Sequence, residues 1–251
     1  MIQFNKNAPQ YDIRKKISYP ESIYKKLSSL CLKHDNALDI ACGNGVSTYR
    51  LSKYFKNVEG IDLGTNLIDI AKKMYPDIKF SVSTAEDYVD SVIKYDLITC
   101  ATAFYWMDRK IVLNNIKQNL NKNGVFCAYK YDFPVIYGAL RDIINFELAT
   151  KWQKHRDSRL IDYDDTLEVL NESKIFNHVQ EFIEPNVIEL SSEDIAYFFL
   201  STSYVTKYIE QSGDNNYSDY LIKKCMQIQN TVKVRFDIHG FIGHGLSIED
   251  Y

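Results

Sequence analysis

One short segment constrains the fold of this chain more strongly than any other. Residues 37–40 form an apolar run that includes Asp39, and a turn of small residues with Gly43 and Gly45 follows. Residues 46–54 then show the spacing of a helix. Because glycine has no Cβ, a ligand can approach the backbone closely at such a strand–turn–helix junction. The segment therefore predicts a ligand-binding loop in a parallel α/β fold.

A second strand, predicted at residues 58–62, also ends in a carboxylate. Asp62 lies about 20 residues beyond the glycine turn, where the acid that binds ribose belongs in a nucleotide-binding βαβ unit. A lone Gly-x-Gly is a weak signal, because any parallel α/β protein can have a glycine at such a turn. Two carboxylate-ended strands flanking one glycine turn are a much stronger signal for a nucleotide-like ligand.

Residues 39–45, with the pattern Asp-x-Ala-Cys-Gly-x-Gly, resemble the cofactor loop of class I S-adenosylmethionine-dependent methyltransferases. That family commonly has glycine where this chain has Ala41. Residues 95–101 resemble the family's fourth strand, and residues 120–126 resemble its turn into the fifth. The resemblance covers about half the chain and is nearest to the small-molecule branch that includes trans-aconitate methyltransferases. A dinucleotide-binding Rossmann enzyme would instead have a third glycine at Thr48.

The resemblance implies an α/β fold, with a Rossmann-like, mostly parallel seven-stranded sheet, helices on both faces and a helical substrate-capping insertion. It implies S-adenosyl-L-methionine as the cofactor, with Asp62 accepting hydrogen bonds from the ribose hydroxyls. Asp39 is expected near the methionine ammonium group, with turn capping as its alternative. The predicted cofactor-binding residues are Tyr11, Arg14, Asp39, Ala41, Gly43, Asn44, Gly45, Asp62, Leu63, Thr84, Ala85, Glu86 and Ala101.

The resemblance implies one methyltransferase domain over residues 1–251. We expect an N-terminal lid and helix at 1–35, a cofactor-binding core at 36–131, and a substrate-capping insertion with the last strands at 132–251. Predicted strands cover residues 37–40, 58–62, 78–82, 97–101, 124–129, 176–183, 186–190 and 231–238. Predicted helices cover residues 46–54, 67–75, 85–92 and 109–120, with further helices starting at Pro20 and near Ser191.

Composition and charge narrow the classes of partner. The net charge of -3 argues against a nucleic-acid binder that relies on a broad basic face. The five cysteines have no zinc-ligand spacing, so we expect buried free thiols in a reducing compartment and no metal site. No signal-like leader and no apolar run of membrane-spanning length is present. We therefore expect a cytoplasmic protein without a membrane partner, either a monomer or a homodimer.

The chemistry is expected beyond the fourth strand. Tyr105 and Trp106 stand where related small-molecule methyltransferases often have His-Trp or Gln-Trp, and His244 lies in a glycine-rich tail that we expect to be flexible. These three are the catalytic candidates. An unperturbed tyrosine is mostly protonated near neutral pH, which favours an acceptor that needs no general base, such as a carboxylate. Candidates to bind an anionic substrate, each more often a surface charge, are Arg141, Arg156, Arg159 and Arg235.

The function predicted is methyl transfer from S-adenosylmethionine to a small-molecule acceptor. Residues 102–106 lack the Asn/Asp-Pro-Pro-Tyr motif of the amino-group methylases of DNA bases and glutamine. Two alternatives stay open at this point: methylation of a protein or peptide side chain, and a non-catalytic subunit that binds the cofactor.

Overall fold

The computed structural model describes residues 13–158, 164–228 and 231–247. The chain divides into two compact units, which we call the core unit and the helical unit. The core unit comprises the described residues of Tyr19–Tyr131, Asp164–Glu184 and Ile238–Tyr251. The helical unit comprises those of Met1–Ser18, Asp132–Tyr163 and Pro185–Asp237.

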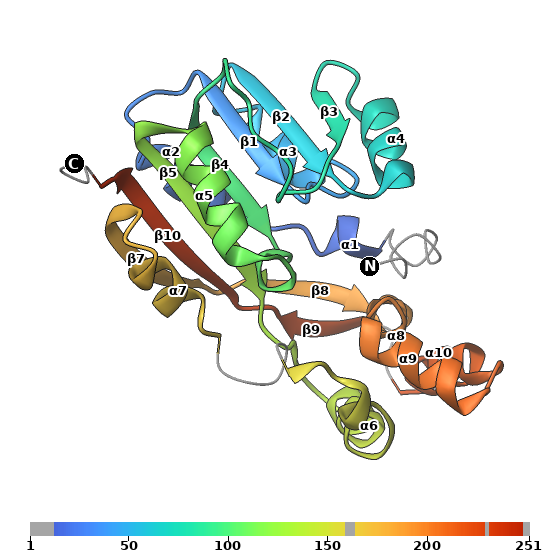
Figure 1. Ribbon diagram of the computed structural model, residues 1–251. Helices are drawn as coiled ribbons and strands as arrows, with labels where there is room; N and C mark the ends of the chain where they lie inside the picture. Colours follow the sequence, from blue (N-terminus) through green and yellow to red (C-terminus); the bar gives the residue numbers. More distant parts are fainter. Residues whose placement is uncertain (1–12, 159–163, 229–230, 248–251) are drawn as a thin grey trace. The chain divides into compact units, whose positions relative to one another are not determined.

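A seven-stranded sheet in the order β3-β2-β1-β4-β5-β10-β7 forms the centre of the core unit (Figure 1). The first five strands of this order are parallel, and β10 runs antiparallel between β5 and β7. This confirms the predicted Rossmann-like, mostly parallel sheet. Its strands are β1 (Asn36–Ile40), β2 (Asn57–Asp62), β3 (Lys79–Val82), β4 (Tyr95–Ala101), β5 (Leu120–Tyr131), β7 (Phe176–Glu184) and β10 (Ile238–Leu246).

Helices cover both faces of this sheet, which is why its central strands are buried along most of their length. All residues of β4 except Ala101 are buried, as expected for a parallel strand covered on both faces. Ile23 and Leu51 pack on one face, and Val112 and Leu170 pack on the other. Figure 1 shows α5 in front of the sheet and α2 behind it. The core-unit helices are α2 (Glu21–Ser29), α3 (Val46–Leu51), α4 (Thr65–Met74), η3 (Phe104–Trp106), α5 (Arg109–Asn119) and α7 (Thr166–Glu172).

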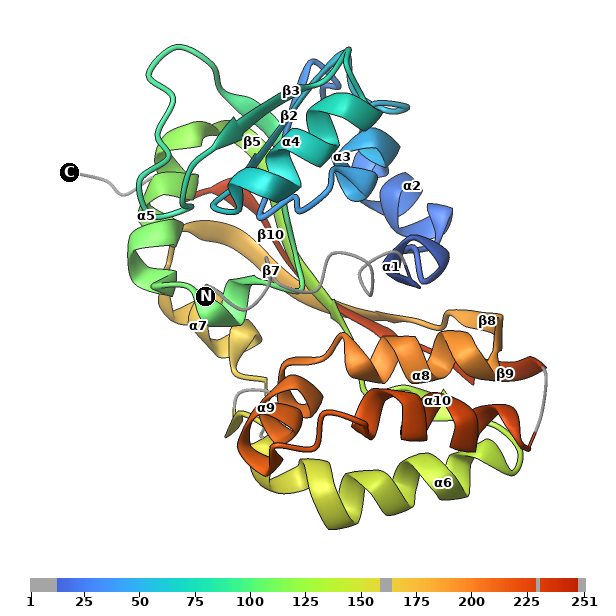
Figure 2. The same ribbon diagram turned by 90° about the vertical axis from the view of Figure 1, so that its right-hand side faces the viewer.

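The helical unit combines a three-stranded antiparallel sheet, in the order β6-β9-β8, with several helices. Figure 2 shows α8 and α10 side by side in this unit. The predicted helix start near Ser191 is confirmed, because its hydroxyl and the Asp194 carboxylate form a capping box. The elements of the helical unit are α1 (Ile13–Lys16), β6 (Val135–Ile136), α6 (Leu140–Glu147), η4 (Leu148–Trp152), η5 (Gln153–His155), β8 (Val187–Ser191), α8 (Ser192–Leu200), α9 (Ser203–Ser212), α10 (Tyr217–Met226) and β9 (Thr231–Arg235).

A buried carboxylate organises the interior of the helical unit. Glu147 is fully buried and accepts a hydrogen bond of 2.7 Å from the Tyr217 hydroxyl, which itself accepts one from the Trp152 indole. Lys151 and Lys224 place their ammonium groups 2.8 and 2.9 Å from the same carboxylate. Although burial opposes ionisation, these donors hold the pKa of Glu147 below its ordinary value.

Three expectations about secondary structure are wrong. Residues 85–92 form turns and irregular backbone rather than a helix. The strand expected over residues 231–238 is two segments, because β9 ends at Arg235 in one sheet and β10 begins at Ile238 in the other. The glycine-rich tail is not loose, since Gly240 and Gly243 lie within β10, where they pair with Phe182 and Val179 of β7.

Candidate functional site

The turn after β1 has the backbone conformation that its glycines predict. Gly43 and Gly45 have φ values of 57° and 81°, in the left-handed region that glycine enters without strain. A Cβ at Gly45 would lie 2.7 Å from the Phe80 ring, whereas one at Gly43 would meet nothing within 4 Å. The backbone at Gly43 therefore faces open space, as a loop must if a ligand is to lie against it.

Ala41 shows why the family commonly has glycine at this position. Its φ is 56°, a left-handed value that costs an L-residue with a side chain roughly 1–2 kcal/mol. Ala41 is partly buried, and in the sequence it stands between the end of β1 and Cys42. Asn44, also in the turn, is partly exposed. The alanine at this position therefore holds a strained backbone conformation.

Asp62 joins the end of β2 to this loop. One carboxylate oxygen accepts a hydrogen bond of 2.9 Å from the Gly43 N–H, and the other accepts one of 2.7 Å from the Gly64 N–H. A carboxylate has about four acceptor positions, so two remain for hydroxyl groups of a ligand. Burial raises the pKa of Asp62, and the two backbone N–H groups oppose that rise. The adjacent Leu63 is 46% exposed and offers an apolar surface beside the carboxylate.

Asp39 lies deeper than its expected role implies. Its carboxylate is fully buried and accepts hydrogen bonds of 2.8 Å from the Thr48 hydroxyl of α3 and the Thr99 hydroxyl of β4. Burial raises its pKa to about 6, against the effect of the two hydroxyls. Asp39 therefore joins β1 to β4 and to the start of α3. Its expected contact with the methionine ammonium group stays a prediction.

The loop after β3 is held by side chains rather than by a helix. Thr84 accepts a hydrogen bond of 3.1 Å from the Asp87 N–H and donates one of 2.6 Å to the Asp87 carboxylate. Ala85 is buried, and Asn115 of α5 donates to its carbonyl at 3.0 Å. Glu86 accepts from the Asp108 N–H at 3.0 Å. These contacts fix the loop against α5, at the same sheet edge as Asp62.

Beyond β4 the chain forms the short η3, which carries Tyr105 and Trp106 with ring centroids 5.2 Å apart. Ala101, at the end of β4, pairs with Tyr129 of β5. Lys130 follows Tyr129 and places its ammonium 5.5 Å from the centre of the Tyr105 ring. The same ammonium lies 2.6 Å from the Asp164 carboxylate, and both side chains are largely buried. Tyr105 therefore stands beside a positive charge at the carboxyl edge of the sheet.

The sequence reasoning missed Lys130 and Thr102. Lys130 had a detectable signal, because it is a charged residue that ends an apolar strand at the ligand edge. Thr102 had no such signal. Its φ is 56°, and because β-branched residues rarely adopt a positive φ, the sequence does not predict this conformation. Its N–H donates to the Tyr129 carbonyl at 2.7 Å, and its hydroxyl is hydrogen-bonded to that of the buried Tyr19. Such strain next to a candidate site is often functional.

His244 does not join this edge, and the expectation of a flexible tail that reaches the crevice is wrong. It lies within β10, opposite Val125 near the start of β5 and opposite His178 of β7. Because ligands in such sheets bind at the carboxyl ends of the parallel strands, His244 is at the other edge. Burial and the neighbouring His178 lower its pKa.

Two of the predicted cofactor residues cannot be placed in the site. Tyr11 lies outside the described residues. Arg14 lies in α1, but its side chain is outside the described part of the structure. The lid predicted for residues 1–35 therefore stays a prediction.

The four arginine candidates for an anionic substrate have different surroundings. Arg141 and Arg235 are paired with Asp142 and Asp237, at 3.0 and 3.1 Å. Arg159 lies outside the described residues. Arg156 lies in the helical unit, with its guanidinium 5.1 Å from the centre of the Phe133 ring.

Within residues 13–158, 164–228 and 231–247, no group of three or more His, Cys, Asp or Glu side chains is arranged to hold a metal ion. No helix in these ranges has the length and apolar character needed to cross a membrane.

Comparison with known proteins identifies the segment that forms this site. Residues 37–124 match the family model described as a methyltransferase domain. Residues 37–124 of the chain are therefore similar to a methyltransferase domain. The matched segment contains the glycine turn, Asp62 and the loop after β3. The S-adenosylmethionine cofactor predicted from the sequence agrees with this domain, and the open backbone at Gly43 and the remaining acceptor positions of Asp62 fit that molecule.

Individual relatives support the methyltransferase domain over part of their length. A Dictyostelium discoideum protein named as a methyltransferase is 33% identical over 115 residues, which are 45% of this chain and 43% of the relative. Malonyl-[acyl-carrier protein] O-methyltransferase 1 of Ilyobacter polytropus is 28% identical over 118 residues, covering 45% of this chain and 44% of that protein. The chain thus spans a little under half the length of these two relatives. A solved structure titled as a type II methyltransferase from Anaeromyxobacter dehalogenans has a TM-score of 0.71 at 18% identity, covering 90% of this chain and 96% of that one. The methyltransferase fold therefore extends beyond the matched segment.

Proposed function

We propose that this protein is an S-adenosylmethionine-dependent methyltransferase that methylates a small-molecule acceptor, with a carboxylate oxygen as the accepting atom. The observation that carries the proposal is the pairing of Asp62 with the Gly43 N–H beside a backbone that faces open space. That pairing leaves acceptor positions for a ribose diol at the place where the methyltransferase domain binds its cofactor.

The residues have separate roles in this proposal. S-adenosylmethionine supplies a methyl group on a sulfonium, which is electrophilic without any metal. Asp62 holds the ribose hydroxyls, Leu63 contributes apolar surface, and the turn at Gly43 lets the ligand lie against the backbone. Trp106 excludes water from the reacting atoms. Since methyl transfer is an in-line displacement, positioning and water exclusion supply much of the rate enhancement.

A carboxylate acceptor is supported by the charge near Tyr105. The Lys130 ammonium lies 5.5 Å from the ring of Tyr105 and has donors beyond the one directed at Asp164. An anionic acceptor at this edge would accept a hydrogen bond from the remaining donors of that ammonium group and would need no base to remove a proton. The named substrate of the Ilyobacter relative, malonyl-[acyl-carrier protein], is also methylated on oxygen according to its name.

We further propose that the reaction takes place in the cytoplasm. The support is chemical: Cys31, Cys42, Cys100, Cys127 and Cys225 are all buried free thiols, a pattern typical of proteins in a reducing compartment.

The deciding experiment supplies tritiated-methyl S-adenosylmethionine with a fractionated metabolite extract, and in parallel with a protein extract. Label in small molecules that mild base releases as volatile methanol supports a carboxylate ester. Base-stable label in small molecules retains the methyltransferase but contradicts the carboxylate. Label confined to protein favours a protein or peptide acceptor. If the purified chain binds the cofactor but transfers no label to either extract, the non-catalytic alternative is favoured. Asp62→Ala, assayed in the same way, controls for contaminating enzymes.

A further inference from the structure

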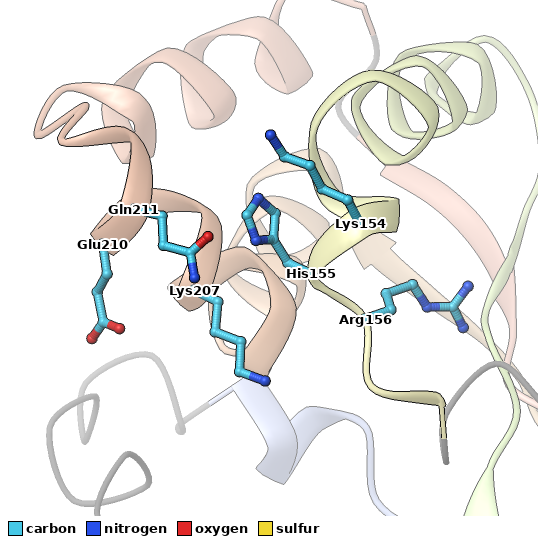
Figure 3. Close-up of a pocket in the computed structure, with 6 residues that line it drawn as sticks. All are labelled: Lys154, His155, Arg156, Lys207, Glu210 and Gln211. Atoms are coloured by element: carbon cyan, nitrogen blue, oxygen red, sulfur yellow. The ribbon is translucent and has the colours of Figure 1, made fainter.

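The helical unit contains a hollow of about 520 Å³ between η5 and α9 (Figure 3). This volume falls within the range of about 300–1,000 Å³ that is typical of small-molecule sites. Both walls come from the helical unit, so the hollow does not depend on the core unit. Its lining residues are Lys154, His155, Arg156, Lys207, Glu210 and Gln211.

The lining is strongly basic. Lys154, His155 and Arg156 are consecutive on one side, and Lys207 comes from the other. Glu210 is the one acid among the lining residues, and Figure 3 shows its carboxylate directed away from His155. A net positive charge inside a concave surface concentrates field lines and favours an anion.

His155 is the most informative of these residues. It is half-buried, and its Nε2 is shielded from solvent and has no hydrogen-bond partner among the residues that the structure describes. Buried ring nitrogens are usually paired, so this nitrogen is an unsatisfied polar atom in the lining of the hollow. Burial first, and then the charges of Lys154 and Lys207, lower the pKa of His155. The Tyr208 ring lies 5.9 Å from the imidazole, edge to face.

We infer that this hollow binds the phosphate or carboxylate groups of a small multivalent anion, held by Lys154, Lys207 and His155. Arg156 adds charge at the rim, because its guanidinium lies over the rings of Phe133 and Tyr204 and points away from His155 in Figure 3. The lining of this site comes from the helical unit alone.

Calorimetry on the full chain tests this site, with pyrophosphate and citrate as probes at low ionic strength. We expect one equivalent of at least one anion to bind. Lys154→Gln and Lys207→Gln should each weaken binding about two- to fivefold, as expected for partly exposed charges, and the double variant by about tenfold. Lys223→Gln removes an exposed charge of α10 outside the hollow and should leave the affinity unchanged. Binding of pyrophosphate alone identifies a phosphate site, and binding of citrate alone a carboxylate site.

Two results would overturn the inference. One is the absence of saturable binding of either anion, and the other is equal weakening by Lys223→Gln, which would indicate general charge attraction. Titration of His155 by NMR gives an independent readout. A nearby anion stabilises the imidazolium, so bound probe should raise the pKa of His155, and an unchanged pKa would contradict direct contact. Because Asp62→Ala should lose the cofactor but keep the anion, failure of this site and failure of the proposed methyl transfer are distinguishable.

Discussion

The Asp62 carboxylate accepts a hydrogen bond of 2.9 Å from the backbone N–H of Gly43. The end of β2 and the turn after β1 are therefore held together by the same group that is proposed to bind the ribose. A substitution at Asp62 removes both a ligand contact and a support of the loop.

Asp62→Ala should weaken S-adenosylmethionine binding by about 10–150-fold, because removing a charged partner from two hydroxyl groups costs roughly 1.5–3 kcal/mol. Calorimetry measures this effect, with circular dichroism to establish that the variant is folded. Asp69→Ala, an exposed acid of α4, is the matched control. Unchanged affinity in Asp62→Ala would show that the cofactor lies elsewhere.

Asp39→Asn should increase stability at pH 8 while weakening cofactor binding. The pKa of Asp39 is raised by burial to about 6, so its contribution to stability is present below about pH 4 and is lost as the pH rises through about 6. The ionised carboxylate then costs roughly 2–3 kcal/mol, which asparagine avoids. Urea unfolding should give a larger difference between variant and parent at pH 8 than at pH 5. The reverse pH trend would contradict this assignment.

Ala41 should respond in opposite directions to a smaller and a larger side chain. Ala41→Gly relieves left-handed strain of roughly 1–2 kcal/mol. Because glycine increases the conformational entropy of the unfolded chain, the substitution also costs about 0.4–1 kcal/mol, so we expect a net stabilisation between about zero and about 1.6 kcal/mol. Ala41→Val places a β-branched side chain at the same φ and should destabilise by more than about 1 kcal/mol. Denaturant midpoints of both variants measure these changes, and destabilisation by glycine would be inconsistent with strain at Ala41.

Tyr105→Phe should slow methyl transfer less than about tenfold, because a carboxylate acceptor needs no general base. Loss of a general base, by contrast, typically lowers the rate by about 10²–10⁴-fold. Single-turnover kinetics isolates this step, and Tyr137→Phe supplies a control at an exposed tyrosine. A loss beyond about a hundredfold, with cofactor affinity unchanged, would indicate that the hydroxyl takes part and that the acceptor is a hydroxyl or amine.

The arrangement of Asp39, Gly43 and Asp62 was predictable because strand ends and turns are coded locally. Each of these residues lies at the boundary of an apolar run, and parallel pairing then brings the boundaries to one edge of the sheet. The pairing of Asp62 with backbone N–H groups was not predictable, since it depends on the left-handed turn that brings the Gly43 N–H within reach.

The errors came from side chains that replace a regular hydrogen-bond pattern. Thr84 with its following acids has the appearance of a helix start. The Asp90 carboxylate, however, accepts from the N–H groups of Val92 and Ile93, and Asn115 binds the carbonyls of Ala85 and Glu86. With these backbone groups satisfied, no helix forms.

The glycines near His244 were misread because glycine marks close packing as well as flexibility. A Cβ at Gly240 would lie 2.2 Å from the Phe182 ring, and one at Gly243 would lie 2.4 Å from the Phe176 ring. Because these glycines have no Cβ, the phenylalanine rings of β7 can pack directly against the backbone of β10. A single sequence does not distinguish glycines that allow close packing from glycines that make a segment flexible.

The position of β10 has a consequence for biosynthesis. This strand occupies the place between β5 and β7, yet both neighbours are translated before it. While the ribosome is still adding residues 238–246, β5 and β7 each present an unpaired edge, which is a hazard for aggregation. The nascent chain therefore requires protection until β10 emerges. Because β5 and β10 are far apart in sequence, closure of the sheet should be a slow step of folding.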